Sequence, residues 1–298
     1  MNYHSPVLLK ESVDALDIKK DGTYIDVTFG GGGHSREILS RLGDKGRLFA
    51  FDQDPDAQRN KIEDSRFVLI AENFRFISRF LRFYGVRKVD GVLADLGVSS
   101  HQFDEAERGF STRFDADLDM RMNQKSELSA KKIVNGYEEK QLADLLFLYG
   151  ELRNARALAA TIVEARLTEK ISTSFQLKEV LQRHLPKAKE HKMLAQIFQA
   201  FRIEVNEELD VLKEFLKQMP GLLNEKGRLS VISYHSLEDR LVKRFIQSGL
   251  FMGQPEKDFY GNISVPLRKI GKLIVPTSQE IKENNRARSA KLRIATHK

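Results

Sequence analysis

Four consecutive glycines at residues 30–33 constrain the fold of this chain more than any other feature. They follow a β-forming run at residues 23–28 and precede a helical pattern in which Ile38, Leu39 and Leu42 share one face. In Rossmann-like α/β folds, a strand, a glycine turn and a helix in this order bring the backbone close to a nucleotide cofactor. Because a simple tight turn does not need four glycines, the segment predicts a cofactor site at the end of the first strand.

The segments that follow alternate between short apolar runs and helical patterns. Strands are expected at residues 23–28, 47–52, 67–71 and 89–95, with helices between them at 35–42, 55–64 and 74–84. Short apolar strands separated by helices indicate a parallel sheet that is covered on both faces. The first third of the chain therefore predicts an α/β fold.

The β pattern disappears after about residue 102 and returns after residue 220. A polar loop at 103–128 leads into helical patterns at 130–135, 138–149, 152–167, 175–184 and 191–219. Later strands are expected at 227–236, 263–267 and 290–295, with a helix at 237–247. We therefore expect one cofactor-binding catalytic domain, residues 1–102 and 209–298, interrupted by an all-helical insertion at 103–208 that recognises the substrate.

The charge of the chain is concentrated near its C-terminus. The formal net charge is +7, and the last 79 residues alone hold 15 basic and 7 acidic side chains. This excess favours a polyanionic partner that touches mainly the C-terminal part. General solubility explains the charge equally well.

Several classes of site and location are disfavoured by composition. Cysteine is absent, which excludes disulfides, thiolate metal sites and a cysteine nucleophile. The seven histidines lack metal-ligand spacing such as HExxH, so no metal site is expected. No run approaches the ~20 apolar residues that span a bilayer, and the first residues lack a signal-peptide pattern. We expect a cytoplasmic protein that does not contact a membrane.

The residues around the glycines narrow the choice of cofactor. A P-loop needs a lysine after its last glycine, whereas His34, Ser35 and Arg36 follow here. The GxGxxG pattern of dinucleotide sites breaks at its third glycine, where this chain has Ser35. Asp52 ends the second expected strand 19 residues after Gly33, which is where a carboxylate that binds ribose hydroxyls belongs. That spacing suits S-adenosylmethionine (SAM) or NAD, and a helix cap is the structural alternative for Asp52.

Longer motifs carry a resemblance to a known family. They are DVTFGGGGHS, FDQDPDA, DLGVSSHQFDEAERGFS, LDMRM, GRLSVISYHSLEDRLVKRF and NNRARSAKLRIA, in the family's order and with its insertion. Over nearly its whole length the chain resembles the bacterial ribosomal RNA small-subunit methyltransferase H family. The resemblance implies a class I SAM-methyltransferase fold, a Rossmann-like sheet that is mostly parallel with an antiparallel C-terminal strand. It also implies SAM-dependent methylation of the exocyclic N4 of a cytidine in the decoding region of 16S rRNA.

The resemblance further implies which residues touch the cofactor. Carried over by position, they are Gly32, Gly33, His34, Asp52, Phe74, Asp95 and Gln102. Asp95 ends the fourth expected strand, at the edge where parallel sheets bind their ligands. A carboxylate there can accept a hydrogen from the target amine and oppose the positive charge that develops on its nitrogen. The alternative is that Asp95 only binds SAM.

Aromatic side chains are the candidates for contact with the target base. Phe110, Phe114 and Tyr234 can stack on a base, and core packing is the alternative for each of them. His235 is a further candidate for substrate contact. Ser236 is expected to cap the helix at 237–247, which is a purely structural role.

The expected partner is 16S rRNA or the small ribosomal subunit. Arg286 and Arg288, with Lys291 and Arg293, are expected to position RNA phosphates, or else form a solvated face. The sequence sets no oligomeric state, and a homodimer is one that it allows. Two other functions compete with methylation. One is an NAD-dependent oxidoreductase on the same fold, and the other is a non-catalytic ribosome-assembly factor that keeps SAM as a structural ligand.

Overall fold

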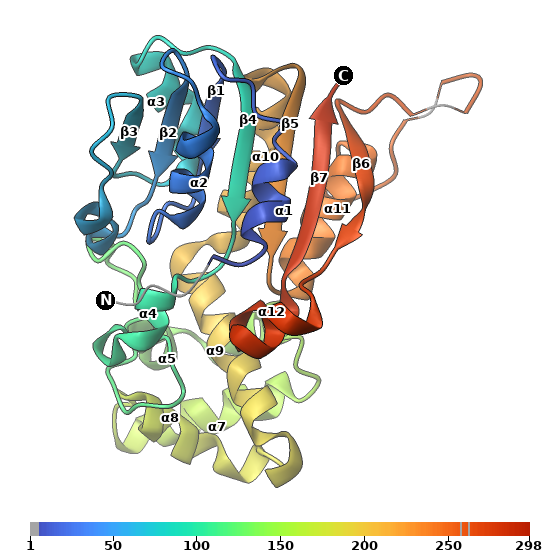
Figure 1. Ribbon diagram of the computed structural model, residues 1–298. Coiled ribbons are helices and arrows are strands. Elements are labelled where there is room, and N and C mark those ends of the chain that lie inside the picture. The colour runs from blue at the N-terminus through green and yellow to red at the C-terminus, as the bar shows by residue number, and fades with distance from the viewer. Residues whose placement is uncertain (1–5, 257, 262) are drawn as a thin grey trace. The chain divides into compact units, whose positions relative to one another are not determined.

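The computed structural model describes residues 6–256, 258–261 and 263–298, and the chain divides into two compact units (Figure 1). The first unit, Met1–Gly97 with Leu209–Lys298, contains the sheet. The second unit, Val98–Glu208, is helical. No helix among the described residues is long and apolar enough to cross a membrane.

The first unit is built on a seven-stranded sheet with the order β3-β2-β1-β4-β5-β7-β6. Its strands are β1 Thr23–Asp26, β2 Arg47–Phe51, β3 Phe67–Ile70, β4 Val89–Asp95, β5 Leu223–Ser233, β6 Leu267–Ile274 and β7 Lys291–His297. Strands β1 to β5 pair in parallel, whereas β7 runs antiparallel to both β5 and β6. The predicted α/β class, a mostly parallel sheet with an antiparallel C-terminal strand, is confirmed.

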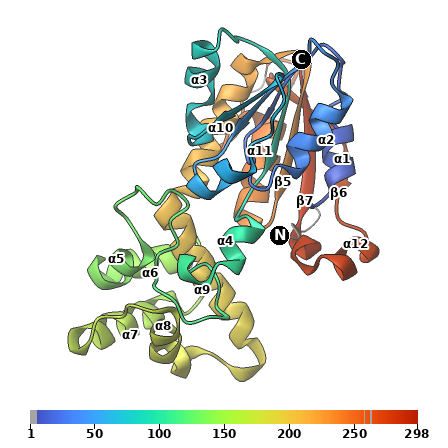
Figure 2. The ribbon, with the colours of Figure 1, turned by 60° about the vertical axis from the view of Figure 1, so that its left-hand side comes forward.

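Helices cover both faces of this sheet, as Figures 1 and 2 show. They are α1 Leu9–Asp14, α2 Gly33–Arg41, α3 Ile77–Phe83, α10 Glu208–Leu222 and α11 Ser236–Ser248. The helix α12 Ser278–Glu283 lies beyond the ends of β6 and β7 (Figure 1), and the 3₁₀ turns are η1 Pro55–Asn60, η2 Phe74–Phe76 and η6 Asn285–Ser289. Alternate strand residues enter opposite cores, as the two-residue period of a strand requires. Phe49 and Phe51 pack with residues of α3 and α10, while Leu48 and Ala50 pack with residues of α1 and α2. Burial on both faces explains why these strands are continuous apolar runs.

Three elements differ from their predicted form. The helix expected at 55–64 is the short 3₁₀ turn η1, because a polar run without an apolar stripe gives a longer helix nothing to pack on. The strand expected at 263–267 is β6, Leu267–Ile274, whose exposed lysines hid its β character. The helix expected at 191–219 is two helices, α9 Glu190–Asn206 and α10, which separate at Glu207 where φ is +50°.

The second unit is a cluster of helices with its own apolar core. Its helices are α4 Ser100–Asp104, α5 Ala130–Gly136, α6 Glu139–Leu148, α7 Ala155–Thr168, α8 Ser174–Leu181 and α9, with 3₁₀ turns η3 Ala106–Arg108, η4 Gln182–His184 and η5 Lys187–Lys189. Apolar residues of these helices, including Leu142, Leu158 and Phe201, are fully buried together.

The long segment between α4 and α5, residues 105–129, is held in place by buried side chains and hydrogen bonds. Leu118 and Met120 are fully buried in the helical core. The Asn206 side chain donates to the Met120 carbonyl at 2.8 Å and accepts from the Met122 amide at 2.8 Å. The Arg108 guanidinium donates to the Arg121 carbonyl at 2.9 Å. These buried anchors give the segment a defined path although it has almost no regular structure.

Candidate functional site

The order of the strands places a ligand-binding edge at the carboxyl ends of β1 and β4. The chain winds from β1 through β2 to β3 on one side of β1 and continues through β4 and β5 on the other side. Open parallel sheets bind ligands where the winding direction changes in this way. Three carboxylates lie at this edge of the first unit: Asp26 at the end of β1, Asp52 after β2, and Asp95 at the end of β4.

The glycine turn between β1 and α2 has backbone geometry that side chains would disturb. Gly32 has a φ of +75° and is the N-cap residue of α2. A Cβ atom on Gly33 would lie 2.2 Å from the Pro6 ring. The Gly30 carbonyl accepts a hydrogen bond from the side-chain amide of Asn60 at 2.9 Å. The glycines are therefore required in part by packing within the protein, and they leave the turn free of side chains.

The Asp52 carboxylate is hydrogen-bonded to the glycine turn. One carboxylate oxygen accepts from the Gly30 amide at 2.8 Å, and the other accepts from the Asp54 amide at 2.8 Å. Burial raises the pKa of Asp52 to about 6, and the Asp54 and Gly30 amides oppose this rise. Each oxygen still has a lone pair, so Asp52 can also accept bonds from two ribose hydroxyls. Asp54, rather than Asp52, caps the η1 turn.

A buried network that the sequence did not point to holds this edge together. The fully buried Asp26 carboxylate accepts from the Ser35 hydroxyl at 2.7 Å and from the Thr28 amide at 3.1 Å. The Thr28 hydroxyl lies 3.4 Å from Asp26 and accepts from the Asp95 amide at 2.7 Å. Burial raises the pKa of Asp26. Asp26 at the end of an apolar strand could have predicted this network, because a buried carboxylate needs several hydrogen-bond donors around it.

The Asp95 carboxylate lies between a tyrosine and a histidine. The Tyr234 hydroxyl donates to one oxygen at 2.7 Å, and Nδ1 of His34 is 3.9 Å from the other. Burial raises the pKa of Asp95 to about 6, and the neighbouring His34 and Tyr234 oppose this rise. Burial and the Asp95 carboxylate together raise the pKa of Tyr234 well above its ordinary value, so its hydroxyl remains a donor.

His34 is almost fully buried and its orientation is set by the backbone. Its Nε2 lies 3.3 Å from the Val7 carbonyl, which can only accept, so Nε2 carries a hydrogen. Burial lowers the pKa of His34, although the Asp95 carboxylate opposes that effect. When His34 is protonated, Nδ1 also carries a hydrogen, and its positive charge beside Asp95 favours the ionised carboxylate.

The remaining residues predicted to contact SAM are divided between the units. Phe74 begins the η2 turn in the first unit, and its ring meets the Phe215 ring edge-on with centroids 5.3 Å apart. Gln102 belongs to the second unit, where it is buried. Its side-chain oxygen accepts from the Ser99 amide at 3.0 Å and closes the capping box of α4. The structure thus gives Gln102 a clear structural role.

The candidates for base stacking differ in exposure. Phe110 is 4% exposed and packs in the helical core, which favours the packing alternative. Phe114 is 43% exposed, with the Arg113 guanidinium 5.8 Å from its ring centre. Tyr234 packs partly against the cluster that contains Ile232 and points its hydroxyl at Asp95.

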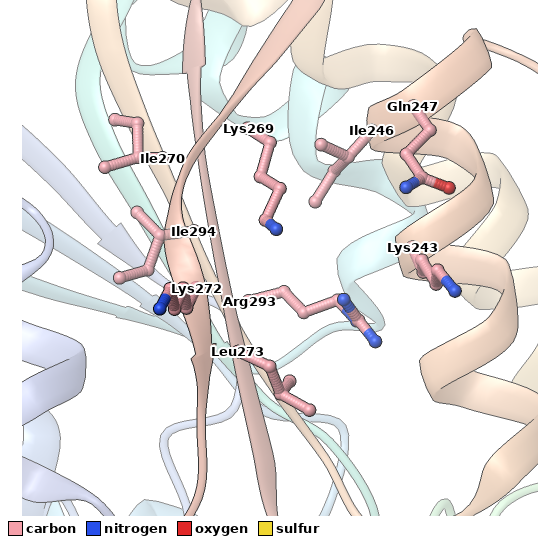
Figure 3. Close-up of a pocket in the computed structure, with 9 residues that line it drawn as sticks. All are labelled: Lys243, Ile246, Gln247, Lys269, Ile270, Lys272, Leu273, Arg293 and Ile294. Atoms are coloured by element: carbon pink, nitrogen blue, oxygen red, sulfur yellow. The ribbon is translucent and has the colours of Figure 1, made fainter.

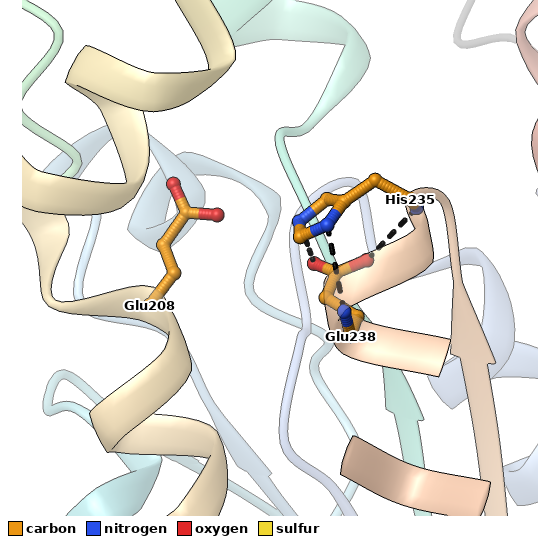
Figure 4. Close-up of side chains that lie close together, drawn as sticks. All are labelled: Glu208, His235 and Glu238. Carbon is orange, nitrogen blue, oxygen red and sulfur yellow. Dashed lines mark hydrogen bonds and ion pairs between the residues drawn. The ribbon is translucent and has the colours of Figure 1, made fainter. Parts of the chain in front are cut away.

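His235, not Ser236, caps helix α11, so the prediction for Ser236 was wrong (Figure 4). The Glu238 amide donates to Nδ1 of His235 at 3.4 Å, and the Glu238 carboxylate accepts from the His235 amide at 3.3 Å. A histidine ring nitrogen can replace a hydroxyl oxygen as a cap because it is also an acceptor. Glu208, the third side chain in Figure 4, belongs to the helical unit, and one histidine with one glutamate does not define a metal site.

Arg293 and Lys291, two of the predicted phosphate contacts, interact with an acidic side chain. The Arg293 guanidinium donates to both Asp239 oxygens, at 2.7 and 3.1 Å, and Lys291 lies 3.5 Å from the same carboxylate. These partners lower the pKa of Asp239 although burial opposes them. Arg288 is exposed on η6, and Arg286 is half-buried beside it.

Fold and site together define the class of protein. The dinucleotide-binding order of this fold has a sixth strand next to β5, whereas here an antiparallel β7 is inserted at that place, which is the arrangement of class I SAM methyltransferases. The glycine turn and the Asp52 and Asp95 carboxylates lie at the sheet edge where this class of protein binds SAM.

The chain belongs to the MraW methylase family, whose model matches residues 1–298. It is similar to the protein named ribosomal RNA small subunit methyltransferase H of Christiangramia forsetii, with 67% identity over 99% of this chain and 98% of that protein. The protein of the same name from Bacteroides fragilis is 56% identical over 99% of this chain and 98% of its own length. Family membership and strand order both argue against the oxidoreductase alternative.

Solved structures with a similar course of the chain are more distant. A putative rRNA-methylase from Clostridium thermocellum is 14% identical, with a TM-score of 0.46 over 100% of both chains. A putative methyltransferase from Streptococcus mutans in complex with SAH is 13% identical, with a TM-score of 0.43 over 97% of each chain.

Proposed function

We propose that this chain transfers a methyl group from SAM to the exocyclic N4 of a cytidine in the 16S rRNA of the small ribosomal subunit. The names of the two curated relatives support this substrate class. The observation that carries the proposal is the Asp95 carboxylate at the carboxyl end of β4, which accepts from the Tyr234 hydroxyl, while the Asp95 backbone amide donates to the Thr28 hydroxyl. SAM, when bound, supplies an electrophilic methyl group on a positively charged sulfur.

The glycine turn and Asp52 are proposed to hold the cofactor. Backbone at Gly32 and Gly33 lies at the switch point and carries no side chains of its own, which suits close approach of the methionine end. Asp52 is preorganised by two amide donors and would accept the ribose hydroxyls. With a pKa of about 6 it is mostly ionised at pH 7.5, as a strong acceptor should be.

Replacing Asp52 by alanine is expected to weaken SAM binding by about 10- to 100-fold, because two charge-assisted bonds to the cofactor are lost. Isothermal titration calorimetry of the full chain with SAM measures this change. Glu63→Ala is the control, since Glu63 is an exposed acid of the same region. Equal affinity of the Asp52 variant and the unmodified protein would remove Asp52 from the cofactor site.

Asp95 is proposed to act on the target amine. The lone pair of an exocyclic cytosine amine is delocalised into the ring, so the amine is a poor nucleophile. A carboxylate that accepts an amine hydrogen localises this lone pair and opposes the charge that develops on nitrogen. Correct placement supplies much of the acceleration in such a transfer. The methylated nitrogen is strongly acidic until it loses a proton, so no strong base is needed.

Tyr234 is proposed to be a positioning residue that acts through Asp95. In Tyr234→Phe the carboxylate loses a donor that favours its ionised form, so the pKa of Asp95 should rise above about 6. The acid side of the rate profile should then shift to higher pH. We expect a fall in kcat of about 3- to 10-fold, with unchanged SAM affinity.

The pH profile of methylation, measured at saturating SAM, tests the role of Tyr234. Tyr137→Phe is a matched control, because Tyr137 also donates to a carboxylate, Glu204 at 2.8 Å, but in the helical unit. A Tyr234→Phe profile that falls uniformly, without a shift of its acid side, would mean that Tyr234 does not tune Asp95.

The two units are proposed to divide the work. The sheet unit would bind SAM and carry Asp95, and the helical unit would recognise the RNA substrate. Phe114, exposed beside Arg113, offers the helical unit an aromatic face with a positive charge next to it. We place the reaction in the cytoplasm, where 16S rRNA is assembled into subunits.

Nucleoside analysis tests the proposed function directly. The purified chain is incubated with SAM and either protein-free 16S rRNA or small subunits from cells that lack this protein, and the RNA is digested. N4-methylated cytidine at a single position is the expected product. SAM binding without methylation of either substrate would favour the assembly-factor alternative.

A further inference from the structure

A shallow pocket lies between helix α11 and strands β6 and β7, at the edge of the sheet (Figure 3). Lys243 and Ile246 come from the helix, Lys269 and Lys272 from β6, and Arg293 from β7. The ion pair between Arg293 and Asp239 of α11 shows that this face of β7 is turned toward the helix. Lys269 pairs with Ala295, two residues along from Arg293, and so shares that face.

Three of these cations are not neutralised within the described part of the chain. Arg293 and the nearby Lys291 share the single Asp239 carboxylate, so one negative charge faces two positive charges. Lys243, Lys269 and Lys272 are exposed, and none makes an ion pair or hydrogen bond with a described residue. Lys243 and Lys269 lie on the side of the sheet that α11 covers, whereas Lys272 lies on the other side of β6 with Ile294, so the three exposed cations are distributed around the edge strand (Figure 3).

Protection of the sheet edge does not explain all three lysines. β6 is the last strand of the sheet, and lysines on an edge strand discourage pairing with another chain. Lys243, however, is on α11 and not on the edge strand. The pocket also has an apolar side, with Ile246 buried and Leu273 39% exposed. Lysine stems can pack along such a surface while their ammonium groups remain free to meet an anion.

The loop that joins α11 to β6 adds exposed aromatic surface. Phe259 is 98% exposed and Tyr260 is 84% exposed, so neither ring contributes to the core. Surfaces that bind flexible RNA combine lysines that follow the backbone with exposed rings that stack on bases. This chemistry favours RNA over a simple polyanion.

We propose that this pocket is an auxiliary RNA-binding surface, in which Lys243, Lys269 and Lys272 hold phosphates of the substrate away from the site of methyl transfer. The inference rests on the proposed function, since it takes the RNA substrate as the occupant. Contacts to phosphates carry no sequence information, so this surface sets affinity and orientation, whereas the choice of cytidine belongs to the site at Asp95.

The test compares two triple variants that lose the same charge. The pocket variant is K243Q/K269Q/K272Q, and the control is K10Q/K20Q/K45Q, three exposed lysines on other parts of the sheet unit. RNA affinity is measured over a range of salt concentrations, and methylation of small subunits is measured alongside. All six lysines are exposed, so thermal unfolding should be unchanged.

The pocket variant should show a slope of log affinity against log salt that is smaller by about 2, and a KM for RNA raised about tenfold near physiological salt. Its kcat at saturating RNA should not change, and the control variant should behave like the unmodified protein. F259A/Y260A should lower RNA affinity without changing the salt slope, because stacking releases no counterions.

Equal losses in the two triple variants would overturn the proposal, because total charge and not the pocket would then set affinity. An unchanged pocket variant would overturn it as well, while leaving the proposed methylation intact. Failure of the proposed function has a different signature, which is absence of methylation by the unmodified protein.

Discussion

Asp95→Asn is expected to lower the methylation rate at saturating SAM and RNA by about 10²- to 10³-fold, which corresponds to a loss of roughly 3–4 kcal/mol of transition-state stabilisation. The amide has the shape of the carboxylate and can still accept from the Tyr234 hydroxyl, now 2.7 Å from Asp95. It lacks the negative charge that opposes the charge developing on the target nitrogen. Single-turnover kinetics with labelled SAM and small subunits measure the effect.

Asp90→Asn is the matched control for this experiment. Asp90 lies on the same strand at its other end, where it accepts from the Thr23 amide at 3.0 Å and lies 3.4 Å from Lys19. Calorimetric titration with SAM separates the two roles considered for Asp95. A large loss of SAM affinity in Asp95→Asn, with an unchanged rate at saturating SAM, would show that Asp95 only binds the cofactor.

The sequence predicts those parts of the fold that a local pattern of apolar and polar residues determines. The strands with continuous apolar runs, such as β2 and β4, were predicted because burial on both faces leaves an unmistakable pattern. The position of β6 was not predicted because this strand lies at the sheet edge, where exposed lysines interrupt the apolar pattern. The break between α9 and α10 rests on a single backbone angle at Glu207, which no periodicity encodes.

For the candidate site, the sequence predicts where the key carboxylates lie but not which side chains contact them. The positions of Asp52 and Asp95 followed from chain topology, because the ends of parallel strands meet at one edge. The side chains that contact these carboxylates could not be predicted from topology, since Tyr234, which donates to Asp95, is 139 residues away in the chain. The buried network around Asp26 was also missed, because a single acid in an apolar strand does not reveal which donors will surround it.

The raised pKa of Asp95 also predicts that the fold is less stable when this residue is ionised. The pKa rises from its ordinary 3.8 to about 6 because of burial, so folding disfavours the charged form. The penalty is nearly absent at pH 3, grows most between about pH 4 and 6, and is complete above about pH 7. Its full size is about 3 kcal/mol of unfolding free energy.

Asp95→Asn should therefore stabilise the cofactor-free protein at pH 8 by about 1–3 kcal/mol, and by roughly a third as much at pH 4.5, where native Asp95 is already neutral but unfolded Asp95 is still mostly ionised. A gain of this size raises Tm by several degrees, at about 2–4 °C per kcal/mol. Scanning calorimetry at the two pH values measures the difference between variant and unmodified protein.

Asp90→Asn is again the control, and it should show no gain at pH 8, because Asp90 has a lysine partner whose attraction it would lose. A gain for Asp95→Asn that is the same at both pH values, or no gain at pH 8, would contradict the assignment of burial as the cause of its raised pKa. A stabilised variant that has lost activity would instead mean that the ionised carboxylate is kept at a cost to the fold, as expected of a group that acts on substrate rather than on structure.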